Sequence, residues 1–350
     1  CDSICDYCDF TKLLYNDYFV KNYLENLKRE LEQYSPFLVE TIYIGGGTPT
    51  SLPYDNLAIL LQAVSKFSSN VKEYTVEANP ENLTREKLEL LKKYGVNRIS
   101  IGVQSTNDEI LCKINRNHTF FDVKQGISLA REIGFTNINV DLIIGLPNVN
   151  KNMFIKDLEN IVSLGVDHIS CYSLTVHPNT VFYNKNIEEP TPEYARELYD
   201  FAHEFLAKNG FTHYEVSNWA KAGKESLHNL TYWKNENYYG VGLGASGYVG
   251  DTRYKNFSNI QKYGVDGFIE ESEKVELNDL RTYQLLTNLR TIHGLDLSDF
   301  KNKFDEDLLE SKKKEIDSLI KENLIKIEEN KIIPTYEGMM LLDQILLKLI

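Results

Sequence analysis

Residues 41–49 read Thr-Ile-Tyr-Ile-Gly-Gly-Gly-Thr-Pro, a short run of strand-forming side chains that stops at three consecutive glycines. β-Branched and aromatic residues favour an extended strand. Glycines directly after a strand allow positive φ angles and bring the backbone close to a ligand. A plain tight turn would have the same composition, but no Gly-Lys-Ser/Thr follows, so a phosphate-binding P-loop is disfavoured. The stretch predicts a strand that ends in a candidate binding loop.

The same alternation of strand and helix repeats along the first half of the chain. Further strand candidates lie at residues 74–77, 98–102, 139–144 and 168–172. Amphipathic stretches with a helical period, such as 85–94 and 121–133, lie between them and predict βα units around a parallel sheet. Polar residues and glycines follow the strands, and in an α/β barrel such positions converge on one face. Five visible strands do not distinguish a barrel from a doubly wound sheet.

The pattern divides the chain into a barrel region, an elaboration and a C-terminal unit. The predicted bounds are residues 1–190, 191–278 and 279–350, in that order. The elaboration holds a helix at 193–208, a strand-like stretch at 213–217 and a glycine-rich stretch at 240–250. The last unit has helices near 280–290 and 308–322, a hairpin near 324–333 and a closing apolar helix. That order predicts a winged-helix-like domain, and its interleaved Lys and Glu favour a packing module over DNA binding.

Composition and charge narrow the class of protein. Hydrophobic residues make up 42% and charged residues 25%, which argues against disorder and fibrous repeats. A net charge of -13 repels polyanions, so we expect no nucleic-acid partner. No apolar run reaches the ~18 residues of a membrane span and no signal peptide is visible, so a cytoplasmic protein is expected. Because the first residue is Cys and not Met, the natural chain is expected to begin earlier.

Three of the five cysteines lie within eight residues, with the spacing C-x3-C-x2-C. Cys1, Cys5 and Cys8 on one tight loop can hold three corners of an iron–sulfur cube, leaving the fourth iron open to bind another ligand. A structural zinc site is the alternative, but it requires a fourth ligand nearby and Phe10 offers none. The spacing therefore favours a cluster.

The cysteine loop, its aromatic residue and the following Gly-Gly-Gly-Thr-Pro turn resemble the radical S-adenosylmethionine superfamily. In that superfamily the open iron of a [4Fe-4S] cluster chelates the amine and carboxylate of S-adenosylmethionine, and reductive cleavage yields a 5'-deoxyadenosyl radical. Tyr7 resembles the aromatic that precedes the third cysteine. The resemblance implies an α/β fold, a partial (β/α)6 TIM-like barrel, with the cluster loop after the first strand. That first strand is missing from this sequence.

The resemblance also implies which residues contact S-adenosylmethionine. These are Gly46, Gly47, Thr48, Glu77, Gln104, Arg116, Asp141, Gly244 and Ala245. The glycine turn would contact the methionine amine, and the four polar side chains would address the ribose, amine and carboxylate. Each has an ordinary alternative, since Glu77 could cap a helix and Arg116 could be a solvated surface charge.

The sequence Gly242-Leu-Gly244-Ala-Ser-Gly247 is a literal G-x-G-x-x-G. Residues 235–239 before it are polar and aromatic, and no βαβ unit surrounds it, so it does not fit a dinucleotide-binding fingerprint. It is similar to a Gly-x-Gly-Ala stretch of oxygen-independent coproporphyrinogen III oxidases and their relatives. That similarity implies that Gly244 and Ala245 are loop backbone near the cofactor.

Two branches of this wider family differ at readable positions. The oxidases have a fourth cysteine two residues after the third, where this chain has Phe10. The motif His228-Asn229-Leu-Thr-Tyr232-Trp233 instead resembles the H-N-x-x-Y-W motif of HemW-type haem chaperones. Its imidazole can serve as an axial iron ligand, and its two aromatics can stack on a macrocycle. A core histidine with ordinary aromatic packing is the alternative.

The resemblance implies a chaperone that binds haem, a [4Fe-4S] cluster and S-adenosylmethionine and delivers haem to respiratory enzymes, with the membrane surface as one place of delivery. The rival is an enzyme, an oxygen-independent coproporphyrinogen III oxidase, and a radical methylase is a third alternative. Whether the chain is an enzyme is left open. Its oligomeric state is also open, with a homodimer as one alternative.

Overall fold

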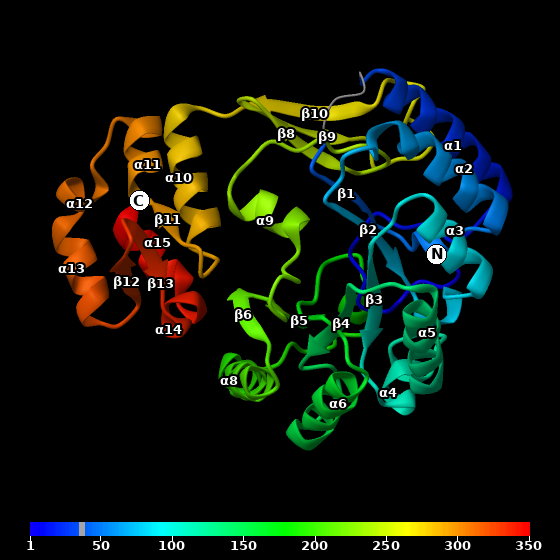
Figure 1. Cartoon of the computed structure of the whole chain (residues 1–350), viewed down its shortest axis with the longest axis horizontal. Coiled ribbons are helices and arrows are strands. Elements are labelled where there is room, and N and C mark those ends of the chain that lie inside the picture. Colours follow the sequence, from blue (N-terminus) through cyan, green and yellow to red (C-terminus); the bar gives the residue numbers. More distant parts are fainter. Residues whose placement is uncertain (35–38) are drawn as a thin grey trace.

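The computed structural model describes residues 1–34 and 39–350 and centres on one curled sheet (Figure 1). In spatial order its strands are β1 (Thr41–Ile44), β2 (Glu73–Ala78), β3 (Arg98–Gln104), β4 (Ile138–Ile144), β5 (His168–Ser173), β7 (Asn218–Ala220) and β6 (Thr212–Glu215). Strands β1 to β5 are parallel, and β7 and β6 add antiparallel pairs beyond β5. This is the predicted partial barrel, and β1 forms one edge of it.

Helices cover the outside of this sheet (Figure 1). They are α1 (Asp17–Glu32), α2 (Tyr54–Val64), α3 (Arg85–Lys93), α4 (Asp108–Lys113), α5 (Phe120–Ile133), α6 (Lys151–Ser163), α7 (Val181–Asn184) and α8 (Pro192–Lys208). Helix α5 illustrates how the sequence sets where a helix begins and which face of it is buried. Thr119 and Asp122 form a capping box at its start, and Val123, Ile127 and Ala130 form its buried stripe.

The two faces of the strands differ in polarity because successive side chains alternate. In β2, Tyr74, Val76 and Ala78 belong to the main hydrophobic core, whereas Glu73 and Glu77 lie at the alternate positions. Polar residues at equivalent positions of the other strands bond to one another across the barrel interior. Asn139 Nδ2 donates to Ser100 Oγ and to Asp141 Oδ1, each at 2.8 Å, and Asn139 Oδ1 lies 2.6 Å from His168 Nδ1. The barrel is therefore apolar outside and polar inside.

A second, smaller sheet follows the barrel, and the sequence did not reveal it. It consists of β8 (Ser246–Val249), β9 (Thr252–Asn256) and β10 (Ile269–Lys274), all antiparallel. The buried carboxylate of Glu30 on α1 ties this region to the barrel by accepting from Gly242 N at 2.8 Å and from Asn256 Nδ2 at 2.6 Å. Helix α9 (Leu227–Trp233) precedes the sheet and lies between the barrel and the C-terminal unit (Figure 1).

The C-terminal unit has its own hydrophobic core and a three-stranded sheet, as a winged-helix-like domain requires. Its elements are α10 (Leu277–Asn288), β11 (Leu295–Asp296), α11 (Leu297–Phe304), α12 (Leu308–Ser311), α13 (Lys313–Lys321), β12 (Ile325–Glu328), β13 (Lys331–Pro334), α14 (Tyr336–Met340) and α15 (Leu342–Leu349). The predicted hairpin is β12–β13, while the predicted helix at 308–322 is broken at Lys312.

Within residues 1–34 and 39–350, no helix combines the length and apolar character that a membrane crossing would need.

Candidate functional site

The cysteine loop is fixed at the carboxyl end of the parallel strands. Its turn is closed by Cys8 N, which donates to Cys5 O at 3.2 Å. Asp6 N donates to Ile114 O at 3.2 Å, and Phe182 N donates to Asp6 O at 2.9 Å. The segments that follow β3 and β5 therefore clamp the loop from two sides.

The three loop cysteines are half-buried free thiols with donors directed at two of them. Thr48 Oγ1 lies 3.8 Å from Cys1 Sγ, and Arg116 Nη1 donates to Cys5 Sγ at 3.3 Å. Hydrogen bonds to sulfur tune and stabilise ligated iron–sulfur clusters. A cube would take one thiolate at each of three irons, and these three thiols are the residues that would hold it.

The two remaining cysteines lie outside the loop. Cys112 is exposed on α4, and Cys171 is buried in β5. Burial raises the pKa of the Cys171 thiol well above its usual range, so it stays protonated. Neither cysteine is a candidate ligand.

The glycine turn after β1 meets a carboxylate from β2. Gly46 has a φ of 102°, a conformation that favours glycine, and its N–H donates to Glu77 Oε2 at 3.1 Å. Tyr43 Oη donates to Glu77 Oε1 at 2.6 Å. Burial raises the pKa of Glu77 to about 7, against the opposing effect of the Tyr43 hydrogen bond. Glu77 can therefore gain or lose a proton near neutral pH beside the turn.

Asp141 lies deeper in the barrel interior. Its carboxylate accepts from Asn139 Nδ2 at 2.8 Å and from Ser100 Oγ at 3.3 Å. Burial raises its pKa, and the hydrogen bonds oppose that shift. The structure brings Asp141 and Glu77 into one interior, since the charge of Asp141 contributes to raising the pKa of Glu77.

Gln104 is the last residue of β3, and Arg116, which follows α4, reaches the same end of that strand with its side chain. Arg116 Nη2 donates to Asn79 Oδ1 at 2.9 Å and to Gly102 O, while its other nitrogen faces the cysteine loop. It is a buried residue and not a solvated surface charge. Gln104 has a φ of 68° beside a β-bulge, an unusual backbone for a side chain of this kind. Such strain is typical of binding sites.

Gly244 and Ala245 lie next to the cysteine loop as well. A side chain at Gly244 would place its Cβ 2.7 Å from Thr11 Oγ1, so only glycine allows this approach. Gly244 N donates to Phe257 O at 3.0 Å, and Asn256 N donates to Ala245 O at 2.8 Å. The structure thus gathers the cysteine loop, glycine turn, Glu77, Arg116 and this second loop at one end of the barrel.

The H-N-x-x-Y-W motif lies on α9 at the opposite end, beside the first residues of β1 and β2. The buried carboxylate of Glu73 accepts from Leu227 N and His228 N, each at 3.0 Å, and from Ser226 Oγ at 3.2 Å. Ser226 also caps the helix by accepting from Asn229 N. Strand β2 therefore fixes the start of the motif helix.

Both ring nitrogens of His228 have partners. Nδ1 lies 2.8 Å from Thr41 Oγ1, and Nε2 lies 2.7 Å from Tyr232 Oη. The ring stacks on Tyr43 with centroids 5.2 Å apart. Burial lowers the pKa of His228 to about 4, so the imidazole is neutral at physiological pH.

Trp233 contacts the C-terminal unit. The guanidinium of Arg290 lies 4.9 Å from its ring centroid, and Asn288 Nδ2 donates to Trp233 O at 2.8 Å. Its role in stacking on a macrocycle stays a prediction, as do the ligand roles of the other motif residues.

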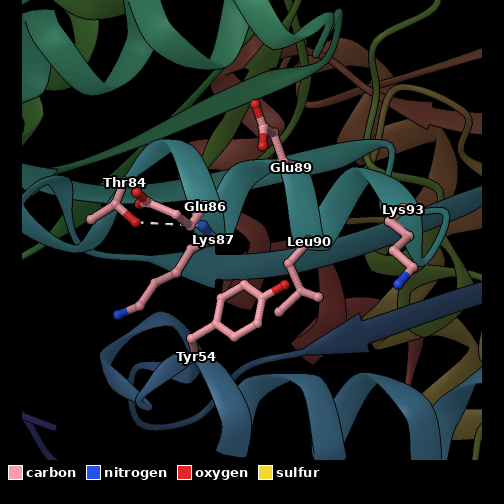
Figure 2. A pocket seen from close by; sticks show the side chains of 7 residues that line it. All are labelled: Tyr54, Thr84, Glu86, Lys87, Glu89, Leu90 and Lys93. Carbon is pink, nitrogen blue, oxygen red and sulfur yellow. Dashed lines mark hydrogen bonds between the residues drawn. The ribbon is translucent and has the colours of Figure 1, made fainter.

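A cavity of about 780 Å3 runs along the edge of β1 that has no strand partner among the described residues. Members of both predicted groups line it: Gly46, Gly244, Ala245, His228 and Tyr232. A second hollow, of about 560 Å3, lies on the outside between α2 and α3 (Figure 2). Among the residues that the structure describes, its lining contains none of the predicted site residues.

Known proteins identify the chain's family. A model of the radical SAM superfamily matches residues 1–161, and a model of the HemN C-terminal domain matches residues 275–341. The heme chaperone HemW of Bacillus subtilis is 38% identical over 99% of this chain and 95% of its own length. The heme chaperone HemW of Lactococcus lactis is 37% identical over 97% of this chain and 92% of its own. This chain belongs to the HemW family.

A solved structure supports the fold of this HemW-family chain. Coproporphyrinogen III oxidase (HemN) from Escherichia coli, a radical SAM enzyme, superimposes with a TM-score of 0.87 over 100% of this chain and 87% of that chain. Its sequence identity is 23%, so the likeness concerns the fold and not the activity. The predicted partial barrel is confirmed.

Sequence reasoning missed several residues that hold the two ends of the barrel in this HemW-family chain. Thr41 and Glu73 anchor the motif helix, and Tyr43 lies between His228 and Glu77. A signal was present: polar residues recur at every second position of β1 and β2, which is unusual for strands buried on both faces. Glu30, by contrast, reads as an ordinary residue of an amphipathic helix, and only its tertiary contacts reveal it.

Proposed function

We propose that this chain is a haem chaperone that binds haem through His228 at one end of its barrel and carries a [4Fe-4S] cluster and S-adenosylmethionine at the other. It hands haem to haem-requiring respiratory proteins. The names of its relatives support the cargo, and the superfamily supports the two cofactors.

One geometric observation carries the proposal, namely the place of His228 at the amino end of the cavity beside β1. His228 contacts Thr41, the first residue of β1, whereas the cysteine loop contacts the glycine turn after that strand. At ~3.3 Å per residue, the five steps from Thr41 to Gly46 span about 16 Å. An oxidase must bring its substrate's propionate carbons to the adenosyl radical. His228 would bind the haem iron at the amino end of the cavity beside β1, and Gly46 lines the same cavity, so it is the iron ligand and not a long distance that favours carriage over decarboxylation.

The state of His228 suits iron ligation. Ligation needs an unprotonated nitrogen, and burial keeps this imidazole neutral with a pKa of about 4. Burial also raises the pKa of Tyr232 above its usual range, so its hydroxyl stays a neutral phenol that iron can displace from Nε2. His228 therefore offers one nitrogen ligand to iron, and the neighbouring Tyr232 oxygen is not an anion that would compete for it.

The cofactor end fits the groups that the superfamily implies. Cys1, Cys5 and Cys8 would hold three irons, and the glycine turn and Glu77 would contact S-adenosylmethionine. When bound, these groups supply reductive cleavage to a 5'-deoxyadenosyl radical. The chain's own contribution is to direct Arg116 at Cys5 and to keep at Glu77 a carboxyl that exchanges its proton near pH 7.

Haem titration of the full chain tests the proposal. We expect a Soret band that saturates near one haem per chain, and at least tenfold weaker binding or a changed band in His228→Ala. His177→Ala is the matched control, because His177 is half-exposed beside Asp9 at the cysteine-loop end. It should bind haem like the wild type.

The same preparation separates the chaperone from the oxidase. After anaerobic cluster reconstitution, with reductant and S-adenosylmethionine, we expect no decarboxylation of coproporphyrinogen III. Robust protoporphyrinogen formation would overturn the proposal in favour of the enzyme. Haem binding that depends on His177 and not on His228 would move the haem site to the cofactor end.

A further inference from the structure

The side chain of Thr41 is the contact that orients the His228 ring from outside the motif helix. Its Oγ1 lies 2.8 Å from Nδ1. The partner of the other nitrogen, Tyr232, lies four residues after His228 on α9 and therefore moves with it. Thr41 belongs to the main sheet, so it holds the ring against a fixed frame.

Residues of β1 and β2 around Thr41 contact His228 from several sides. Thr41 and Glu73 are direct partners in the parallel register of β1 and β2. Both of these neighbouring residues contact His228. Thr41 bonds to its ring, and Glu73 accepts from its backbone N–H at 3.0 Å. Tyr43, two positions along on the same face of β1, stacks on the ring. Ring position and tilt are set from three directions.

We propose that Thr41 is a positioning residue for haem binding: its hydroxyl oxygen accepts a hydrogen bond from Nδ1–H and so presents the unprotonated Nε2 to the haem iron. The inference rests on the proposed function. In a neutral imidazole one nitrogen carries the proton and the other a lone pair. A partner that accepts from Nδ1–H selects the tautomer with the lone pair on Nε2. It also raises the basicity of that nitrogen toward iron.

The geometry leaves Nε2 as the ligand atom. Nδ1 faces the hydroxyl of Thr41, whose backbone is fixed by the register of β1 and β2. Nε2 faces the phenol of Tyr232, at the tip of a long side chain on α9. Thr41 and Tyr232 both line the cavity beside β1, and the phenol is the partner that a bound iron would replace.

The experiment compares haem complexes of the full-length chain carrying single substitutions. Thr41→Val removes the hydroxyl while keeping the shape of the side chain, and Thr41→Ser keeps the hydroxyl. Thr75→Val is the matched control, since Thr75 is a buried threonine on the same face of neighbouring β2 and is bonded to Arg98. Circular dichroism and thermal unfolding verify that each variant is folded. The readouts are haem affinity, the iron–histidine stretching frequency of the ferrous complex and the reduction potential of the bound haem.

We expect Thr41→Val to weaken haem binding by about tenfold. The stretching frequency should fall and the potential should become more positive, because Nε2 becomes a weaker donor. Thr41→Ser and Thr75→Val should stay within about threefold of the wild type and keep its spectrum. A folded Thr41→Val with unchanged affinity and stretching frequency overturns the inference while leaving the proposed function standing. If His228→Ala binds haem like the wild type, the proposed function is wrong at this residue and the inference falls with it.

Discussion

Two glutamates on β2, four residues apart and on the same face, hold the two ends of the barrel in different ways. Glu73 is fully buried at the amino end and meets three donors from the start of α9. Glu77 is half-buried at the carboxyl end and meets two donors, Tyr43 Oη and Gly46 N in the glycine turn. The first is an anchor. The second is a carboxyl with a pKa of about 7, at the end where the cofactor residues gather.

The difference shows how one strand can serve two purposes. A buried carboxylate that accepts three hydrogen bonds fixes the groups that donate them, and its loss leaves buried donors without acceptors. A carboxyl with fewer donors in a desolvated place has a shifted pKa, which is typical of functional sites. If the haem end and the cofactor end work independently, a substitution at one end should leave ligand binding at the other end unchanged.

The largest expected effect is at the cofactor end. Anaerobic reconstitution should give about four irons per chain, and Cys5→Ala should reduce iron to background because a cube site loses one of its three thiolates. Haem binding at His228 should be unchanged. Iron content and Soret titration measure the two separately. Cys112→Ala, an exposed cysteine on α4, is the control and should keep its iron. Parallel loss of iron and haem would mean that the ends are not separate.

The next effect concerns the anchor. Glu73→Ala should lower the free energy of unfolding by about 3 kcal/mol, because three donors lose a charged acceptor in a buried place. Glu77→Ala should cost about 1 kcal/mol, since one of its two donors is the exposed Gly46 N–H. Urea unfolding followed by circular dichroism gives both values. Equal losses would contradict the distinction between an anchor and a titratable group.

The two ends should also respond to pH with opposite signs. The folded pKa of His228 is about 4, below the unfolded value near 6.5, so the unfolded state takes up the proton first as pH falls. The contribution of His228 to the free energy of unfolding therefore falls by about 2 kcal/mol when the pH is lowered from 7 to 5. Glu77 has a raised folded pKa of about 7 against an unfolded value near 4.3, so its contribution is fully present below pH ~4 and is lost as pH rises from there to 7.

Unfolding of the wild type and of His228→Gln at pH 5 and pH 7 measures the first of these contributions. The variant should lose less stability on acidification than the wild type. Other buried histidines contribute to both proteins equally, including His213, whose pKa burial lowers to about 3. The same loss in both proteins would show that His228 is not held neutral by the fold.

The smallest effect concerns Tyr43, which touches both ends. Tyr43→Phe removes the hydrogen bond to Glu77 but keeps the ring on His228. We expect a loss of about 1 kcal/mol in stability and a further rise in the Glu77 pKa, because that hydrogen bond lowers it. Carbon NMR of the Glu77 carboxyl measures the pKa. The haem spectrum should not move, and a shift would reveal coupling between the ends.

Much of the fold was readable from the sequence. The predicted strands at 41–44, 74–77, 98–102, 139–144 and 168–172 all lie within strands of the main sheet. The predicted hairpin near 324–333 is also present. The sheet of β8 to β10 was not predicted, because β10 is exposed along its whole length and charged, so it carries no hydrophobic alternation. The break at Lys312 was missed because the amphipathic pattern continues through it.

The sequence alone determined the βα alternation, the cysteine spacing and the H-N-x-x-Y-W motif, since each is a local pattern set by residue type and interval. Only the tertiary structure decided that the motif lies at the other end of β1 from the cysteine loop. It also decided which side chains hold it, because Thr41 and His228 are 187 residues apart and a hydrogen bond between them follows from strand register and chain path. Local patterns name the chemistry that a residue can perform, whereas long-range packing sets its neighbours, its burial and hence its protonation state.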